Sequence, residues 1–125
     1  MTPRLTLMNP VLPVSDMPRA LAFYRDVLGF EVLWQYGEPT VRAGVGRDGF
    51  DLQLDLPPEG ARGPVSVYFH VDDVESYHAA CSERGGALVR ELGDQPFGLR
   101  DFVVEDPDGN HLGFGQPLSD ESPEA

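Results

Sequence analysis

The feature that most constrains the fold is a pattern that occurs twice along the chain. "VSDMPRALAFYRDVLG" and "VDDVESYHAACSERGG" each place Asp before an amphipathic stretch of helical periodicity and Gly after it. Asp16 and Asp73 are 57 residues apart, and Gly29 and Gly86 have the same separation of 57 residues. Equal offsets at both ends of two predicted helices indicate an internal duplication.

Local signals predict where each helix begins and ends. Ser15 or Asp16 is expected to cap the first helix, which ends at Gly29. Asp72 with Glu75 three residues later resembles a capping box for the second helix, which ends at Gly85 or Gly86.

Each predicted helix is preceded by one alternating apolar stretch and followed by three more. The stretches are "LMNPVLPV", "FEVLWQY", "TVRAGVG" and "FDLQLDL" in the first half, and "VSVYFHV", "ALVREL", "LRDFVVE" and "HLGFGQ" in the second. This order predicts an α+β fold in which two βαβββ modules form a curved mixed sheet around a concave cavity. The chain is then one domain built of two repeated modules, at about 5–56 and 65–116. A linker at 57–64 joins the modules, and a flexible acidic tail follows at 117–125.

Composition narrows the classes of partner. The net charge is −12 and all nine basic residues are Arg, with no basic patch, which argues against nucleic-acid binding. Strong acidity can steer cationic ligands toward the protein. A single Cys excludes a disulfide framework, and no apolar run approaches the ~20 residues of a membrane span. No signal-like segment opens the sequence, so a cytoplasmic protein without membrane contact is expected.

Three motifs carry a resemblance to a known group. They are "VSD…ALAFYRDVLGF", then "FHVDD", then "DPDGNHLGF". From about Leu7 to Gln116 the chain resembles the vicinal-oxygen-chelate superfamily, which includes glyoxalase I, extradiol dioxygenases and bleomycin-resistance proteins. The resemblance implies the same paired modules that the repeat predicts.

Enzymes of that superfamily usually bind a divalent metal through His or Glu on the first and last strand of each module. Carried over to this chain, the four ligand positions are Asn9, Gln53, Ser66 and Gly113. None is His, Asp or Glu, and a set without an anionic or imidazole ligand binds a divalent ion poorly. We therefore expect no metal and no other cofactor. An alignment shifted by one or two residues would place His70 or His111 at a ligand position instead.

Within the superfamily, the resemblance is closest to the metal-free bleomycin-resistance proteins, through "PVLPVSD" and "ELGDQPFGLRDFVVEDPDGN". It implies a homodimer that holds a drug in clefts between subunits, with an exchanged N-terminal strand that has Pro10 near its start. Trp34 and Phe97 match aromatic positions that stack on the drug. Either ring can equally fill the core. The other candidate ligand-binding residues are Tyr36, Phe50, Tyr68 and Phe102, most of which are expected to serve the core instead.

The sequence therefore predicts a bleomycin-resistance-like protein that sequesters an aromatic drug, neutral or cationic, without chemistry on it. Acidic residues near strand ends and in loops are candidates for meeting a positive charge: Glu38, Asp51, Asp55 and Asp94. One alternative is a metal-dependent enzyme of the glyoxalase or dioxygenase type, which requires a complete metal site; another is a metal-free sensor or accessory protein on the same scaffold.

Overall fold

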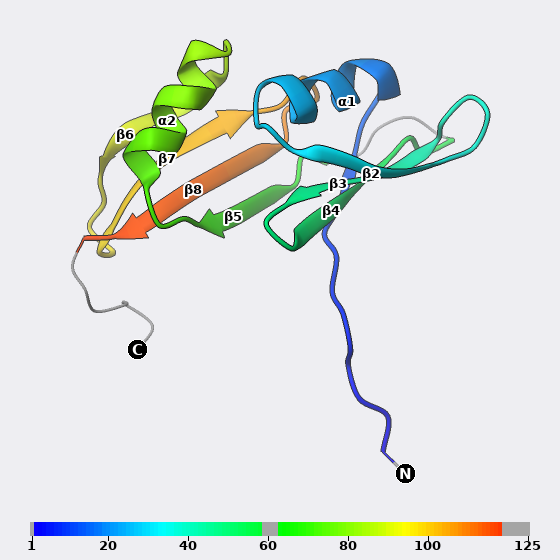
Figure 1. Cartoon of the computed structure of the whole chain (residues 1–125), viewed down its shortest axis with the longest axis horizontal. Helices are drawn as coiled ribbons and strands as arrows, with labels where there is room; N and C mark the ends of the chain where they lie inside the picture. Colours follow the sequence, from blue (N-terminus) through cyan, green and yellow to red (C-terminus); the bar gives the residue numbers. More distant parts are fainter. Residues whose placement is uncertain (1, 59–62, 119–125) are drawn as a thin grey trace.

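The computed structural model describes residues 2–58 and 63–118, and these form two modules with the same order of elements (Figure 1). The first module consists of β1 (Val11–Pro13), α1 (Met17–Asp26), β2 (Glu31–Tyr36), β3 (Arg42–Arg47) and β4 (Phe50–Asp55). The second consists of β5 (Ser66–His70), α2 (Val74–Glu83), β6 (Ala87–Asp94), β7 (Leu99–Glu105) and β8 (His111–Pro117). The predicted α+β fold of two βαβββ modules is confirmed.

Strand pairing is also the same in both modules. The strand orders are β1-β4-β3-β2 and β5-β8-β7-β6, with the first strand parallel to the last and the other pairs antiparallel. Helix α1 packs on the first sheet and α2 on the second, on the same side of the molecule (Figure 1). Each four-stranded sheet therefore has one face covered by a helix and one face that carries no helix, called here the helix-free face.

The two helices begin and end 57 residues apart, as the repeat predicts. Asp16 accepts a hydrogen bond from the Arg19 amide at 3.0 Å, and Asp73 accepts one from the Ser76 amide at 3.1 Å. These contacts make both aspartates N-caps, because each satisfies a backbone N–H that has no partner within its helix. The predicted cap at Asp72 is wrong by one residue.

The helix ends differ slightly between the modules. The left-handed residue after α1 is Gly29 with φ 72°, but after α2 it is Gly85 with φ 87° and not Gly86. The two left-handed glycines, Gly29 and Gly85, are therefore one residue closer in sequence than the 57 residues that separate the two helices. The reason is local, since two residues (27 and 28) separate α1 from its glycine and only Arg84 separates α2 from Gly85.

One hydrophobic core joins the modules, and its fully buried members come from both sheets and both helices. The "DPDGN" turn between β7 and β8 fastens the second module to the first. Tyr24 on α1 donates its hydroxyl to the buried carboxylate of Asp106 at 2.8 Å, and Asn110 donates to the carbonyl of Pro13 at 3.0 Å. In the other direction, Tyr77 on α2 donates to the carbonyl of Leu28 at 2.6 Å.

The chain before β1 differs from the expectation. The sequence predicts a strand over "LMNPVLPV", yet only Val11–Pro13 pair with β4. Pro10 and Pro13 have no amide hydrogen for a ladder, which limits the strand's length. Residues 2–10 have no helix or strand, and 2–8 extend away from the body (Figure 1).

Parts of two predictions fall on residues 59–62 and 119–125, which lie outside the described residues; they are the middle of the linker and most of the acidic tail. Within the described ranges, no helix has the length and apolar character needed to cross a bilayer.

Candidate functional site

The helix-free face of the first sheet carries an indole ring seated on a glycine. Strand alternation turns Leu52 and Leu54 toward α1 and puts Gly44 on the opposite face. Trp34 on β2 pairs with Gly44 on β3, and a Cβ built on Gly44 would collide with the indole. Glycine therefore lets the ring lie close against the sheet. Trp34 keeps 39% of its surface exposed, so a ligand can still reach it.

Polar side chains of β3 and β4 lie on the same face as this ring. Arg42 bonds the carboxylate of Asp55 and the amide oxygen of Gln53, both at 3.3 Å. Asn9 donates to Asp51 at 3.2 Å. Among the described residues, the partner of the Asp51 carboxylate is this neutral amide, and no cationic side chain pairs with it. Its negative charge is therefore uncompensated on this face.

The helix-free face of the second sheet has its own ring over glycine. Tyr68 on β5 covers Gly113 and Gly115 on β8, where an added Cβ would collide with the phenol ring. Its hydroxyl donates to Asp101 at 2.8 Å, and Asp101 in turn bonds Arg90 at 2.7 Å. Burial, followed by the bond to this carboxylate, raises the pKa of Tyr68 and keeps the phenol a neutral donor.

The donors at the four superfamily ligand positions do not fit a divalent ion. The Asn9 amide and the Gln53 oxygen are already bonded to Asp51 and Arg42, as described above. Gly113 has no side chain, and Tyr68 occupies the space beside it. Among residues 2–58 and 63–118, no group of three or more His, Cys, Asp or Glu side chains is placed to hold a metal.

A shifted alignment does not complete a metal site within the described residues either. His111 lies on the helix-free face, two residues before Gly113, with Nε2 3.4 Å from Glu105 and with Ser66 opposite it on β5. His70 packs its ring edge-on against Tyr68, with centroids 5.5 Å apart. One imidazole and one carboxylate lie together at His111, which is fewer strong donors than a catalytic metal usually takes.

The structure divides the six predicted ligand-binding residues among different places. Trp34 and Tyr36 lie on β2 of the first sheet and Tyr68 lies on the helix-free face of the second. Phe97 is about half exposed in the turn between β6 and β7. Phe102 is fully buried in the core, stacked on Phe114, so a ligand has no access to it in this structure.

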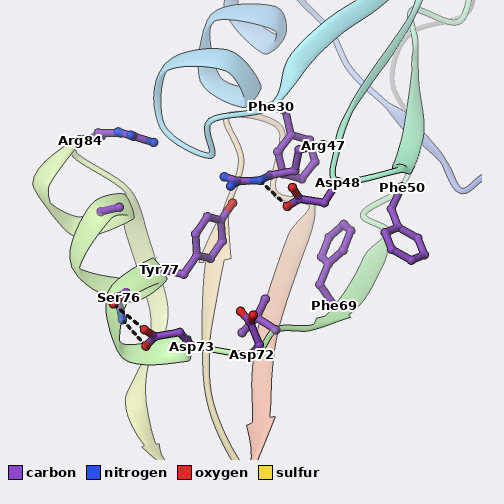
Figure 2. A pocket seen from close by; sticks show the side chains of 12 residues that line it. Phe30, Arg47, Asp48, Phe50, Phe69, Asp72, Asp73, Ser76, Tyr77 and Arg84 are labelled. Carbon is purple, nitrogen blue, oxygen red and sulfur yellow. Dashed lines mark hydrogen bonds and ion pairs between the residues drawn. The ribbon is translucent and has the colours of Figure 1, made fainter.

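The sixth predicted residue, Phe50, lies at the rim of a cleft on the helix side of the sheets. This cleft has a volume of about 380 Å³ and lies where the β3–β4 hairpin of the first module approaches β5 and α2 of the second (Figure 2). Arg47, Tyr77 and Arg84 also line it. Sequence reasoning missed these three residues because no local pattern reveals which side chains meet when two modules dock.

Comparison with known proteins gives the family. The model of the Glyoxalase/Bleomycin resistance protein/Dioxygenase superfamily matches residues 6–114. An uncharacterized protein of Mycobacterium bovis is 30% identical, over 89% of this chain and 83% of its own length. A lactoylglutathione lyase of Neisseria meningitidis serogroup A is 29% identical, over 92% of this chain and 93% of its own length.

Among solved structures, TnmS3, an antibiotic binding protein from Streptomyces sp. CB03234, is similar with 30% identity and a TM-score of 0.72. The similarity covers 91% of this chain and 99% of TnmS3. Together with the repeated βαβββ modules, the match of the superfamily model over most of the chain identifies the family. The chain belongs to the glyoxalase/bleomycin resistance protein/dioxygenase superfamily.

Proposed function

We propose that this protein binds a planar aromatic antibiotic on its helix-free sheet faces and sequesters it without chemical change. The observation that carries the proposal is Trp34, held against Gly44 with more than a third of its surface accessible. A rigid indole on a sheet offers a large stacking surface at small entropic cost, and stacked rings add about 0.5–1.5 kcal/mol beyond burial.

The polar groups on these faces support binding rather than catalysis. Asp55 is paired with Arg42, and the buried carboxylate of Asp101 is occupied by Arg90 and Tyr68. The superfamily's ligand positions hold no strong metal donor. Since these are the positions that make its members metal enzymes, binding by shape and stacking is the function that the side chains favour.

A positive charge on the ligand fits the electrostatics. The chain carries a net charge of −12, and Asp51 presents a carboxylate without a cationic partner among the described residues on the same face as Trp34. Tyr36 on the same strand is 69% exposed and offers a second ring. An acidic surface also raises the association rate of a cationic ligand by electrostatic steering.

We also propose that the active form is a homodimer whose residues 2–8 are exchanged between subunits. Three large apolar side chains of this arm are almost fully exposed: Leu5, Leu7 and Met8. Apolar residues at this density on an extended arm are typical of a segment that is buried against a partner. A second copy of the chain is the occupant that would bury both arms by symmetry.

The relatives are consistent with this function but include enzymes. TnmS3 is an antibiotic binding protein, whereas the Neisseria meningitidis relative is a lactoylglutathione lyase, and the two are about equally similar to this chain. The donor set at Asn9, Gln53, Ser66 and Gly113 favours the binding function over the lyase.

Fluorescence titration tests the proposal, because Trp34 is the only tryptophan of the chain. A panel of planar and intercalating antibiotics should contain a compound that quenches Trp34 saturably and is recovered chemically unchanged. In calorimetry with that compound, Trp34→Ala should weaken binding by about 2 kcal/mol or more. Phe23→Leu is the control, since Phe23 lies on α1, on the helix side of the sheets, and should leave the affinity unchanged.

Recovery of an altered compound, or an effect of Trp34→Ala within ~0.5 kcal/mol, would contradict the proposal. The dimer has its own test by sedimentation. Full-length protein should sediment as a dimer and a chain lacking residues 2–8 as a monomer; a monomeric full-length protein would refute the exchange.

A further inference from the structure

The inter-module cleft brings together two guanidinium groups, of which only one is paired with a carboxylate. A Cβ built on Gly29 would lie 2.9 Å from Nη1 of Arg84 and 3.2 Å from Nη1 of Arg47, so both groups converge on the same point of the chain. Arg47 is paired with Asp48 at 2.9 Å. Arg84 has no ion pair with any residue that the structure describes.

This convergence is unusual for so acidic a chain. Two guanidinium groups that approach the same point repel each other. The chain has nine Arg and no Lys against 21 acidic residues, and two of the nine Arg meet here. An anion placed between the two guanidinium groups would relieve the repulsion and receive charge-assisted hydrogen bonds from both.

Aromatic rings line much of the cleft beside the arginines. Tyr77 lies under the Arg47 guanidinium, whose carbon is 5.4 Å from the ring centroid, and Phe69 and Phe30 complete the inner wall. Phe50 stands at the rim and is 74% exposed. In Figure 2 the two arginines lie at one end of the cleft, and Tyr77 and Phe69 lie between them and the other end.

The far end of the cleft carries acidic groups. Asp73 is there, but its oxygens cap α2 through the Ser76 amide and hydroxyl at 3.1 and 2.8 Å. Asp72 lines the same end, away from the arginines (Figure 2). The arginine end thus holds two cationic groups and one carboxylate, Asp48, whereas the far end holds two carboxylates, so an anionic group is favoured only at the arginine end.

We propose that this cleft is a second binding site, which takes an aromatic carboxylate with its ring against Phe69 and Tyr77 and its carboxylate between Arg47 and Arg84. The volume of about 380 Å³ is within the range of small-molecule sites. The site lies on the helix side of the sheets, so it is separate from the Trp34 face and its ligand carries the opposite charge from the one favoured there.

The experiment is a titration of the isotope-labelled full chain with 2-naphthoate, followed by amide and side-chain NMR signals. Saturable shifts are expected at the Gly29 amide and the Arg84 side chain, while the indole N–H of Trp34 stays in place as an internal reporter of the other face. The neutral isostere 2-naphthamide should bind at least about fivefold more weakly, because it lacks the charge.

Arg84→Gln should weaken binding of 2-naphthoate by about tenfold through loss of one charge-assisted contact. Arg25→Gln is the matched control, since Arg25 lies on the exposed face of α1 and pairs with Asp26, and should leave the affinity unchanged. Absence of shifts at Gly29 and Arg84 up to about 10 mM ligand overturns the proposal. Shifts at Trp34 alone, or equal affinity for the amide, overturn it as well.

Discussion

Replacing Gly113 with Ala tests why a glycine stands where metal enzymes of this superfamily carry a ligand. A Cβ on Gly113 would lie 2.6 Å from Cδ1 of Tyr68, well inside van der Waals contact. The ring must therefore move. Its hydroxyl then leaves the carboxylate of Asp101, which is fully buried and retains only Arg90 as a partner among the described residues.

The size of the effect follows from three contributions. Loss of a hydrogen bond to a charged group costs about 1.5–3 kcal/mol. Overpacking costs about 1–3 kcal/mol, and removal of a glycine from a strand returns about 0.5–1 kcal/mol. Tyr68 is 38% exposed, so its ring can yield partly toward solvent and the cost falls in the lower part of the range. Gly113→Ala should reduce the free energy of unfolding by about 2–3 kcal/mol.

Urea unfolding followed by circular dichroism at one fixed protein concentration measures this change. With an m-value of about 2 kcal/mol/M, the midpoint should fall by about 1 M or more. The matched experiment places Gly113→Ala in a Tyr68→Ala background, where no ring opposes the new methyl group. There the substitution should be neutral or stabilising by up to about 1 kcal/mol. An unchanged midpoint in the natural chain, or equal destabilisation in both backgrounds, would refute the reasoning.

Two further perturbations probe the helix contacts. Tyr24→Phe removes the hydroxyl that donates to the buried carboxylate of Asp106, which keeps its hydrogen bonds from Asp108 and Asn110. The free energy of unfolding measured in urea should therefore fall by about 1–2 kcal/mol. A loss below ~0.5 kcal/mol would contradict this contact. Hydrogen bonds from the amide and hydroxyl of Ser76 lower the pKa of Asp73. The stabilisation is therefore present above about pH 4 and is lost as the pH falls further through the folded-state pKa. Asp73→Asn should flatten this acid dependence of the melting temperature, and an unchanged profile would show that the cap contributes nothing.

The sequence predicts the fold well because the decisive information is local and repeated. Apolar alternation marks the strands, and Asp16 and the adjacent pair Asp72 and Asp73 mark the helix starts, so two copies of one order of elements imply two copies of one topology. The errors are local too. Asp72 has the sequence features of a cap, but which of two adjacent aspartates turns toward the first free amide depends on backbone angles that spacing does not give.

The sites were less predictable because they depend on contacts between strands and between modules. The sequence alone shows that Gly113 has no ligating side chain. It does not show that Tyr68 fills the resulting space, because this depends on the register between β5 and β8. Phe102 and Trp34 are both aromatic strand residues, and their different burial follows from which face of its sheet each side chain meets. Arg47 and Arg84 converge only because the modules dock.

Elemental analysis of protein purified without chelator, then dialysed against Fe²⁺, Mn²⁺, Ni²⁺ or Zn²⁺, tests the central claim most directly. If stacking on the helix-free faces replaces metal chemistry, each ion should remain far below one per chain, and Trp34 fluorescence should be insensitive to it. One tightly held ion per chain that is lost on Gln53→Ala would contradict the account and assign the protein to the metal-dependent enzymes of its superfamily.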